Sequence, residues 1–210
     1  MEDIPEKDRK ISTEETLLFF QSIESQSLYQ DLAIVQFYCA GRIGEIAGIQ
    51  VKNINLKLRT LKIKEVLIWI NGIPKVKKTP KNDQSREVFI NDTLLKIFQR
   101  RLKQVPNGCA FLFHDSGHPL RYNRINVAFN DAWKKAGLSG KFSGSHLLRY
   151  SSAQTARKIT GSLDAVAAVT GHQSMKMAEH YGKLDSTDLN QSSLREMEKH
   201  VKRLETSKAA

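Results

Sequence analysis

The apolar periodicity changes twice along this chain, and those changes most constrain its fold. An apolar run follows Ser12, and from Leu28 to Ile46 the apolar residues recur at spacings of three and four, which is typical of helices with one buried face. From Ile54 to Ile90 they are largely β-branched or aromatic, separated by the turn signals Asn71-Gly72 and Lys81-Asn82-Asp83. Helical spacing then returns. The sequence therefore predicts an α+β fold, mainly helical with a small antiparallel sheet.

Capping and breaking residues predict where the helices begin and end. Ser12 and Glu15 form a capping box for the first helix, and Gly41 breaks a second helical stretch that runs from Leu28 to Ile46. Later helices are predicted from Asn91-Asp92 to about Gln104, from Arg121 to Lys135, after Ser143-Gly144-Ser145, and between Gly161-Ser162 and Gly171. Phe111 to Phe113 is predicted to be a short strand. We expect residues 1–11 to form an arm or linker.

Basic residues are concentrated in the predicted sheet. The chain has 33 Lys and Arg against 22 Asp and Glu, a net charge of +11 at pH 7. Val51 to Arg86 contains ten basic residues but only two acidic ones, Glu65 and Asp83, so ten minus two leaves a local charge of +8. A solvated strand face is the ordinary interpretation of such a run. The size of the excess favours contact with the phosphates of DNA or RNA instead.

Several classes of protein and site are disfavoured. No run approaches the 18 apolar residues of a membrane span, and the charged N-terminus has no apolar signal region, so we expect a cytoplasmic protein without a membrane partner. Cys39 and Cys109 stand far apart in apolar surroundings, which predicts buried thiols rather than a disulfide or a zinc site. A metal site could be drawn from His114, Asp115 and His118, or with His180, but the turn from 115 to 119 is better explained as a polar surface loop.

Two short motifs place polar side chains on one helix face. Arg42 and Glu45 are one turn apart, which alone predicts a surface ion pair. His146 and Arg149 form an H-x-x-R pair, and His146 stands at a helix start, where free N–H groups favour a phosphate. Tyr181 follows the Gly171-His172 turn by nine residues, and a lone tyrosine is usually a half-buried packing residue.

Together and in this order, these motifs resemble those of the tyrosine recombinase, or phage integrase, family. The boxes read Ala40-Gly41-Arg42-Ile43-Gly44-Glu45-Ile46-Ala47-Gly48-Ile49, His146-Leu147-Leu148-Arg149-Tyr150 and Thr170-Gly171-His172, followed by Tyr181. The resemblance covers about Ser12 to Asp185. It implies a catalytic domain over residues 12–185 with the fold of DNA breaking-rejoining enzymes. It also implies a double-stranded DNA partner and no metal, ATP or other cofactor, and the sequence has no P-loop motif.

The resemblance further implies a role for each matched residue. Tyr181 matches the nucleophile, Arg42 and Arg149 the phosphate-binding arginines, His146 and His172 the histidines of the later boxes, and Glu45 a supporting partner. A hairpin lysine completes such a site. Lys78, before Thr79, resembles it best, and Lys75, Lys77 and Lys81 remain alternatives. We expect a hairpin from Lys75 to Arg86 with Lys78 near its tip. DNA contacts are expected from Lys75, Lys77, Lys81 and Arg86.

The chemistry of strand exchange supports these residue types independently. Displacement at a phosphodiester builds negative charge on the nonbridging oxygens, which two guanidinium groups can bind bidentately. A tyrosine phenol needs a base or a cationic field, and the departing 5′ oxygen needs a proton. His146 is the predicted base and Lys78 the predicted acid. A phosphotyrosine link conserves the phosphate bond, so rejoining needs no nucleotide.

The chain departs from the family pattern in two places, and its end allows two interpretations. Tyr150 stands where a histidine or arginine is common. The usual N-terminal helical domain is missing, so the chain is either an excised fragment or a naturally short protein. Residues 186–210 are predicted to hold an amphipathic helix with the apolar stripe Leu194, Met197, Val201 and Leu204. That helix either passes to a neighbouring protomer on DNA or packs back on its own domain.

Three other functions are weighed against recombination. A catalytically silent DNA-binding regulator is disfavoured because all matched positions are filled. A general nucleic-acid binder is disfavoured because clustered aromatic residues for base stacking are few. A type IB topoisomerase is disfavoured because those chains are larger and the boxes match integrases closely. We expect the protein to work on nucleoid DNA.

Overall fold

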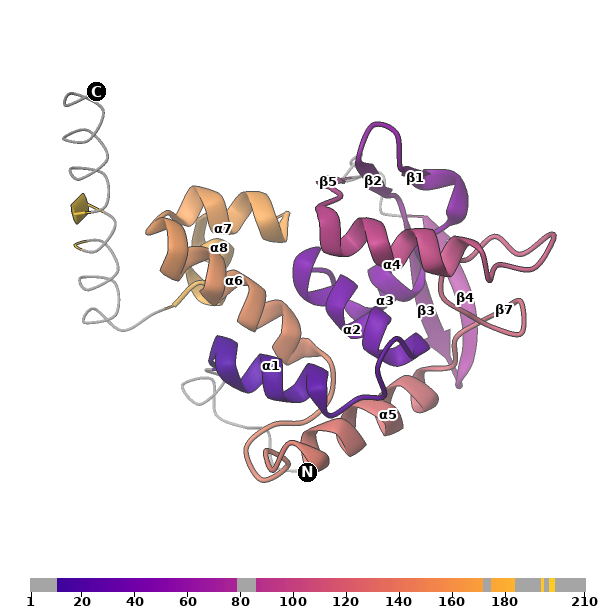
Figure 1. The fold of residues 1–210 in the computed structure, drawn as a ribbon, viewed down its shortest axis with the longest axis horizontal. Coiled ribbons are helices and arrows are strands. Elements are labelled where there is room, and N and C mark those ends of the chain that lie inside the picture. Colours follow the sequence, from indigo (N-terminus) through magenta and orange to yellow (C-terminus); the bar gives the residue numbers. More distant parts are fainter. Residues whose placement is uncertain (1–10, 79–85, 172–174, 184–193, 195–196, 199–210) are drawn as a thin grey trace. The chain divides into compact units, whose positions relative to one another are not determined.

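The computed structural model describes residues 11–78, 86–171, 175–183, 194 and 197–198 (Figure 1). The chain divides into two compact units, and the boundary falls between Ser151 and Ser152, inside helix α6 (His146–Thr160). None of the helices in the described ranges has the length and apolar character needed to cross a membrane.

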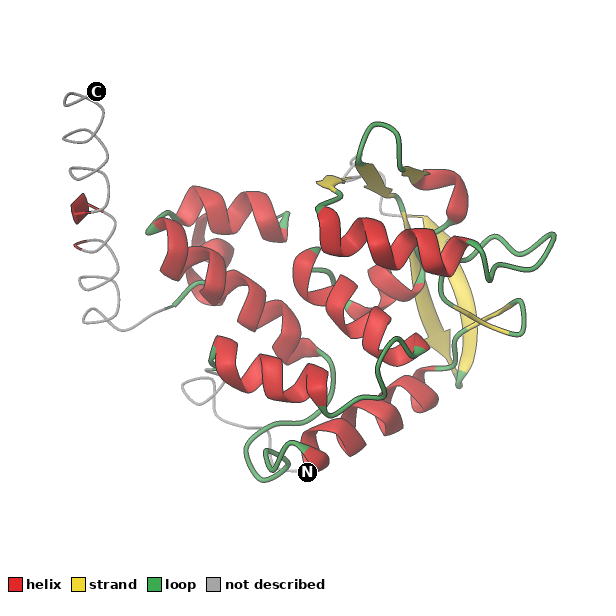
Figure 2. Cartoon of the chain, in the orientation of Figure 1, coloured by secondary structure: helices red, strands yellow, loops and turns green. Residues whose placement is uncertain are grey.

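The helices of the first unit follow the capping signals of the sequence. They are α1 (Thr13–Gln21), α2 (Leu28–Tyr38), α3 (Ile43–Ala47), α4 (Asp92–Leu102) and α5 (Tyr122–Lys135), with a 3-10 turn at Val51–Asn53. The predicted capping box is confirmed, because Ser12 Oγ accepts from Glu15 N at 3.0 Å and Glu15 Oε2 accepts from Ser12 N at 2.8 Å. Asn91 Oδ1 likewise accepts from Leu94 N at 2.9 Å at the start of α4. Figure 2 shows these helices together with the strands and loops that join them.

Within residues 54–90, the described strands form two separate sheets rather than the single predicted one. Strands β1 (Ile54–Asn55), β2 (Thr60–Ile63) and β5 (Arg86–Phe89) pair antiparallel in the order β1-β2-β5, while β3 (Glu65–Ile70) pairs only with β4 (Ile73–Lys78). The β3–β4 turn is the predicted Asn71-Gly72. Both residues have a positive φ, 51° and 75°, as a two-residue type I′ hairpin turn requires.

The expectation of one hairpin from Lys75 to Arg86 is wrong. Its two ends lie on β4 and β5, and these strands do not pair with each other. β4 runs in register with β3 over its full length, from Ile73 opposite Ile70 to Lys78 opposite Glu65. The edge of β2 is left for β5, and Ile63 lies opposite Arg86. The tight local turn therefore decides the pairing of β4, and β5 takes a partner further back in the chain. The second predicted turn, at residues 81–83, lies outside the described residues.

The region after α4 also differs from the prediction. Within the described residues, Phe111 makes only an isolated bridge to Gln50, and the strands here are β6 (His114–Asp115) and β7 (His118–Pro119). The turn expected to be a loop is thus the end of a short β-hairpin, in which Ser116 and Gly117 have positive φ. Leu112 and Phe113 are both buried, and two successive buried side chains do not fit the alternation of a strand with one solvent face.

The core of the first unit is built around an aromatic group. Phe19, Phe129, Trp133 and Phe142 are all at most 1% exposed. The ring centroids of Phe19 and Trp133 lie 3.9 Å apart, and those of Trp133 and Phe142 lie 5.5 Å apart. These contacts join α1, α5 and the loop before α6. Because that loop leads to His146, the core helps to fix where the second motif begins.

The two cysteines are both free thiols, but only one is buried as predicted. Cys39 has no exposed surface, whereas Cys109 is half-buried. Burial raises the pKa of the Cys39 thiol to about 12, against a smaller lowering by the nearby Arg86 guanidinium. Cys109 follows Gly108, which has a positive φ, in a turn closed by a hydrogen bond from Cys109 N to Pro106 O at 3.0 Å.

The second unit contains the rest of α6, α7 (Leu163–Thr170) and α8 (Met175–Tyr181), and the last two pack against each other. Ser162 Oγ caps α7 by accepting from Asp164 N at 3.1 Å, as the Gly161-Ser162 break predicts. Gly171 ends α7 with a φ of 72°, the left-handed conformation that glycine adopts at helix ends. Leu194, Met197 and Glu198 are helical, whereas Val201 and Leu204 lie outside the described residues.

Candidate active site

Helix α3 is held against strand β3 by two glycines one turn apart. A Cβ atom on Gly44 would lie 2.3 Å from the carbonyl oxygen of Leu67, and one on Gly48 would lie 2.8 Å from Leu67 N. Only glycine permits this approach of a helix to a strand backbone. The small residues of the first box therefore seat α3 on the sheet, which determines where Arg42 and Glu45 stand.

Arg42 and Glu45 form the ion pair that their spacing predicts. Arg42 Nη1 donates to Glu45 Oε1 at 3.1 Å, and the backbone N of Arg42 donates to Glu45 Oε2, also at 3.1 Å. The second bond caps the N-terminus of α3. The Arg42 side chain is 58% exposed and that of Glu45 only 12%. The guanidinium group of Arg42 is therefore accessible to a ligand, while the carboxylate that holds it is largely buried.

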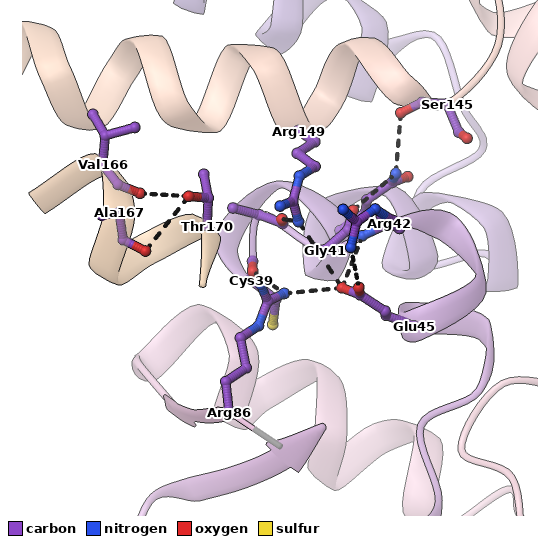
Figure 3. A network of polar contacts seen from close by, with 12 residues as sticks. Cys39, Gly41, Arg42, Glu45, Arg86, Ser145, Arg149, Val166, Ala167 and Thr170 are labelled. Carbon is purple, nitrogen blue, oxygen red and sulfur yellow. Dashed lines mark hydrogen bonds and ion pairs between the residues drawn. The ribbon is translucent and has the colours of Figure 1, made fainter. Parts of the chain in front are cut away.

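Two further arginines from other elements meet the same carboxylate (Figure 3). Arg86 Nη2, from β5, lies 3.2 Å from Glu45 Oε2, and Arg149 Nη1, from α6, lies 4.0 Å from it. Arg86 is 18% exposed and Arg149 only 1%. We call Arg42, Glu45, Arg86 and Arg149 the arginine cluster. One carboxylate among three guanidinium groups leaves a net positive charge, which suits an anion with more than one oxygen.

Three successive carbonyl groups before Arg42 accept hydrogen bonds from three different elements. Cys39 O accepts from Arg86 Nη2 at 2.9 Å, and Ala40 O accepts from Arg149 Nη1 at 2.5 Å. Gly41 O accepts from Gln36 Nε2, on α2, at 3.3 Å. Ala40 has a φ of 45°, a left-handed conformation that is uncommon for alanine. We call residues 39–41 the clamped turn, because side chains fix its backbone immediately before Arg42.

His146 is the first residue of α6 and is exposed, as the helix-start prediction requires. The loop before it is tightly bonded. Gly144 N donates to Asn130 Oδ1 at 2.9 Å, and Gly144 O accepts from Trp133 Nε1 at 2.8 Å. On its own helix, the His146 ring meets the ring of Tyr150 edge to face, with centroids 5.2 Å apart. Tyr150 is buried, so it supports the imidazole from beneath rather than facing solvent.

The predicted lysines are described only in part. Lys75 and Lys77 are exposed on β4. The backbone of Lys78 is the last of β4 and lies opposite Glu65, while its side chain and all of Lys81 lie outside what is described. Arg86, predicted to contact DNA, instead has its guanidinium group on Glu45 and Cys39 O, and a DNA contact for it stays a prediction.

In the second unit, Tyr181 is the last residue of α8 and only 5% exposed. Its ring meets that of His180 edge to face, with centroids 5.3 Å apart. Gly182 follows, and a Cβ there would lie 3.0 Å from Val166 Cγ2 on α7, which indicates why a small residue succeeds the tyrosine. His172 lies outside the described residues.

His114 and Asp115, two of the residues from which a metal site could be drawn, have local structural contacts. His114 Nδ1 accepts from Gly117 N at 3.2 Å within the β6–β7 hairpin, and Asp115 forms an ion pair with Arg124. Among the residues that the structure describes, no three His, Cys, Asp or Glu side chains are grouped so that they could hold a metal ion.

Sequence reasoning missed Gln36 and the structural contacts of Arg86. Gln36 is completely buried on α2, in the helical stretch with Leu32, Val35 and Cys39. A polar residue within an apolar helical stripe was the available signal, because buried amides need hydrogen-bond partners. Arg86 carried no such signal, since it belongs to a run of basic residues and its contact with Glu45 depends on strand pairing.

Comparison with known proteins supports one family. The sequence model of the Phage integrase family matches residues 10–187. The crystal structure of XerA recombinase has a TM-score of 0.70 at 18% identity, covering 89% of this chain and 62% of that one. The Tn1549 transposon integrase in complex with circular intermediate DNA has a TM-score of 0.71 at 18% identity, covering 93% and 68%. No curated protein matches the sequence.

A third solved structure gives the same picture. The XerH site-specific recombinase bound to palindromic difH substrate, a post-cleavage complex, has a TM-score of 0.66 at 20% identity over 87% of this chain and 52% of that one. The chain thus spans about half to two thirds of these relatives. The likenesses confirm the α+β fold of a tyrosine recombinase catalytic domain, and the family model covers most of the sequence. The chain belongs to the phage integrase family.

Proposed function

We propose that this chain is the catalytic part of a site-specific DNA recombinase that cuts and rejoins strands through a 3′-phosphotyrosyl link. The arginine cluster carries the proposal, because it gathers three guanidinium groups from α3, β5 and α6 around one carboxylate. The Tn1549 integrase and XerH structures are complexes with DNA, which supports DNA as the partner. Such an enzyme acts in the cytoplasm, on nucleoid DNA.

In the proposed reaction, Tyr181 Oη attacks a phosphorus atom of the DNA backbone and the bond from phosphorus to the 5′ oxygen breaks. The phenol proton goes to His146, and Lys78 gives a proton to the departing 5′ oxygen. Arg42 and Arg149 stabilise the charge that builds on the nonbridging oxygens. Reversal by a 5′ hydroxyl from another strand rejoins the DNA. The chemistry needs no metal, nucleotide or other cofactor.

The test is a search for a covalent adduct. We expect the protein, incubated with nicked or supercoiled DNA in the presence of a chelator, to form a protein–DNA adduct that survives denaturant. Tyr181→Phe removes the attacking oxygen and should form none. Tyr122→Phe is the matched control, because Tyr122 is an exposed tyrosine on α5, and it should form adduct as the unaltered protein does.

Other outcomes would assign a different function. DNA binding without adduct would indicate a silent DNA-binding regulator of the same fold. An adduct that Tyr181→Phe still forms would move the nucleophile to another residue. Loss of the adduct on chelation would indicate a metal-dependent reaction and contradict the mechanism.

Self-association on DNA through residues 186–210 is part of the same proposal. Leu194 and Met197 are 59% and 63% exposed, and exposed apolar side chains at helical spacing favour a partner. Sedimentation should show higher assemblies with DNA than without it. If truncation after Asp188 leaves the assemblies on DNA unchanged, this part of the proposal is wrong.

A further inference from the structure

A single buried amide connects the two motifs that carry the catalytic side chains of the first unit. Gln36 Nε2 donates to Gly41 O at 3.3 Å and to Ser145 O at 3.0 Å. Gly41 is the residue before Arg42, and Ser145 is the residue before His146. The two carbonyl groups belong to segments more than 100 residues apart in the chain, and one nitrogen atom binds both.

The side chain is a costly way to fill this position. Gln36 has no exposed surface, and in the described part of the chain its Oε1 atom has no hydrogen-bond partner. A buried, unsatisfied polar atom opposes folding. Methionine has a similar length and volume and would fill the same space without that oxygen. Packing alone therefore does not account for an amide at this position.

The geometry of the amide explains what it contributes. Its two N–H groups lie in one plane at fixed angles, so two carbonyl oxygens bound to them are held at a fixed separation. The opposite orientation of the amide would place Oε1 against both carbonyl oxygens, so only one orientation fits. The Gly41 peptide leads directly into the Glu45 cap of α3, and the Ser145 peptide leads into the first turn of α6.

We propose that Gln36 is a positioning residue that fixes the separation of Arg42 and His146. In this proposal Gln36 does not touch DNA. It acts through the backbone segments that carry Arg42 and His146. The inference rests on the proposed function, because the separation matters only if both residues act on one phosphate. Its structural part, that one amide couples the two segments, is testable without catalysis.

The test compares Gln36→Met with Gln30→Met. Gln30 lies on the same helix, and its Nε2 also donates to two backbone carbonyls, those of Phe20 and Ile23, outside the catalytic motifs. For Gln36→Met we expect DNA affinity to stay within about threefold. Adduct formation at saturating DNA should slow by about 10²-fold, the effect of misplacing a catalytic group by about 1 Å. Gln30→Met should change neither quantity.

Hydrogen exchange supplies a readout that does not depend on activity. The amides of Glu45 and Ile46 donate to Arg42 O, and that of Leu148 donates to Ser145 O. In Gln36→Met both groups of amides should exchange faster, while those of α4 keep their rates. Gln36→Asn keeps an amide, but its side chain is too short to reach both carbonyl groups. This variant should perturb the fold less than Gln36→Met and show a smaller increase in exchange at the same amides.

The outcomes separate this inference from the proposed function. If the unaltered protein forms no adduct, the proposed function fails, while the exchange pattern still decides whether Gln36 couples the segments. Faster exchange throughout the first unit, or equal losses of affinity and cleavage rate, would make Gln36 merely structural and overturn the inference. Unchanged exchange and cleavage in both Gln36 variants would overturn it as well.

Discussion

The arginine cluster and the basic strand β4 carry the same sign of charge in opposite settings. Arg149 and Arg86 are 1% and 18% exposed, and each guanidinium group bonds to a backbone carbonyl of the clamped turn. Lys75 and Lys77 extend from β4 into solvent. The first region has its charges fixed before any ligand arrives, whereas the second can adapt to the path of a backbone.

This difference indicates separate roles for the arginine cluster and the β4 lysines, which we call the division between catalysis and affinity. Fixed charges need little reorganisation when a transition state forms, so they are effective in catalysis. Mobile surface lysines contribute mainly by releasing counterions from DNA, so they affect affinity and its salt dependence. A local charge count cannot separate the two, since Arg86 belongs to the same basic run as the lysines. Of the three predictions below, ordered from the largest effect to the smallest, the first two test this division and the third tests the burial beside the arginine cluster.

The largest effects are expected within the arginine cluster. Arg149→Ala and Arg42→Ala should each slow adduct formation by about 10²-fold at saturating DNA, because each removes a preorganised cation. Arg149→Ala should also lower the free energy of unfolding by about 3 kcal/mol, since it deprives Ala40 O of its guanidinium donor and removes the most deeply buried of the three cations around Glu45. Arg42 is 58% exposed, so Arg42→Ala should change that free energy by less than about 1 kcal/mol. Cleavage kinetics and urea unfolding measure both quantities.

If Arg149→Ala and Arg42→Ala lowered the free energy of unfolding equally, the distinction between a buried and an exposed member of the arginine cluster would be wrong. Equal losses of DNA affinity and cleavage rate would make both arginines simple phosphate anchors.

A smaller effect is expected on β4. Replacing Lys75 and Lys77 together by alanine should reduce the slope of log affinity against log salt by about 1.8, or about 0.9 for each phosphate that a lysine no longer neutralises. The rate of adduct formation at saturating DNA should change by less than about twofold. Lys134 and Lys135, exposed lysines on α5, provide the matched double-alanine control and should leave the slope unchanged. A large loss of rate without a change in slope would place a β4 lysine in the catalytic machinery.

The smallest effect concerns the thiol beside the cluster. The pKa of Cys39 is raised to about 12, chiefly by burial. Between the ordinary thiol pKa and that value, the folded state keeps the proton while the unfolded chain loses it. The free energy of unfolding should therefore fall as pH rises from about 9 towards 12. Unfolding of the unaltered protein and Cys39→Ala at pH 8 and 10 measures this effect, and the variant should show the shallower decline. Parallel declines would mean that Cys39 opens to solvent in the native state.

Local signals in the sequence predicted most of the helices. Ser12, Asn91 and Ser162 cap α1, α4 and α7 as expected, because the capping bonds involve only nearby residues. Strand pairing was predicted less well. The Asn71-Gly72 turn was clear, but the pairing of β5 with β2 depends on segments that are not adjacent in the chain.

The candidate site shows the same division between local and distant information. The pairing of Arg42 with Glu45 and the position of His146 at a helix start follow from spacing within one helix. Arg86 and Arg149 meet Glu45 from two distant segments of the chain, and residue spacing does not predict such a contact. The place of Gln36 in an apolar stripe signalled that it is buried, but not its partners, which lie five and 109 residues away.

The left-handed conformation of Ala40 has a consequence for how this protein can change over generations. With a φ of 45°, an L-residue costs the fold on the order of 1–2 kcal/mol that glycine would not. Glycine at position 40 would remove that cost and also open further conformations to the clamped turn. If the clamped turn positions Arg42 for cleavage, we expect heat resistance and turnover to make opposite demands on this one residue. We expect a screen for thermal stability alone to favour glycine there, and with it a less constrained backbone before Arg42.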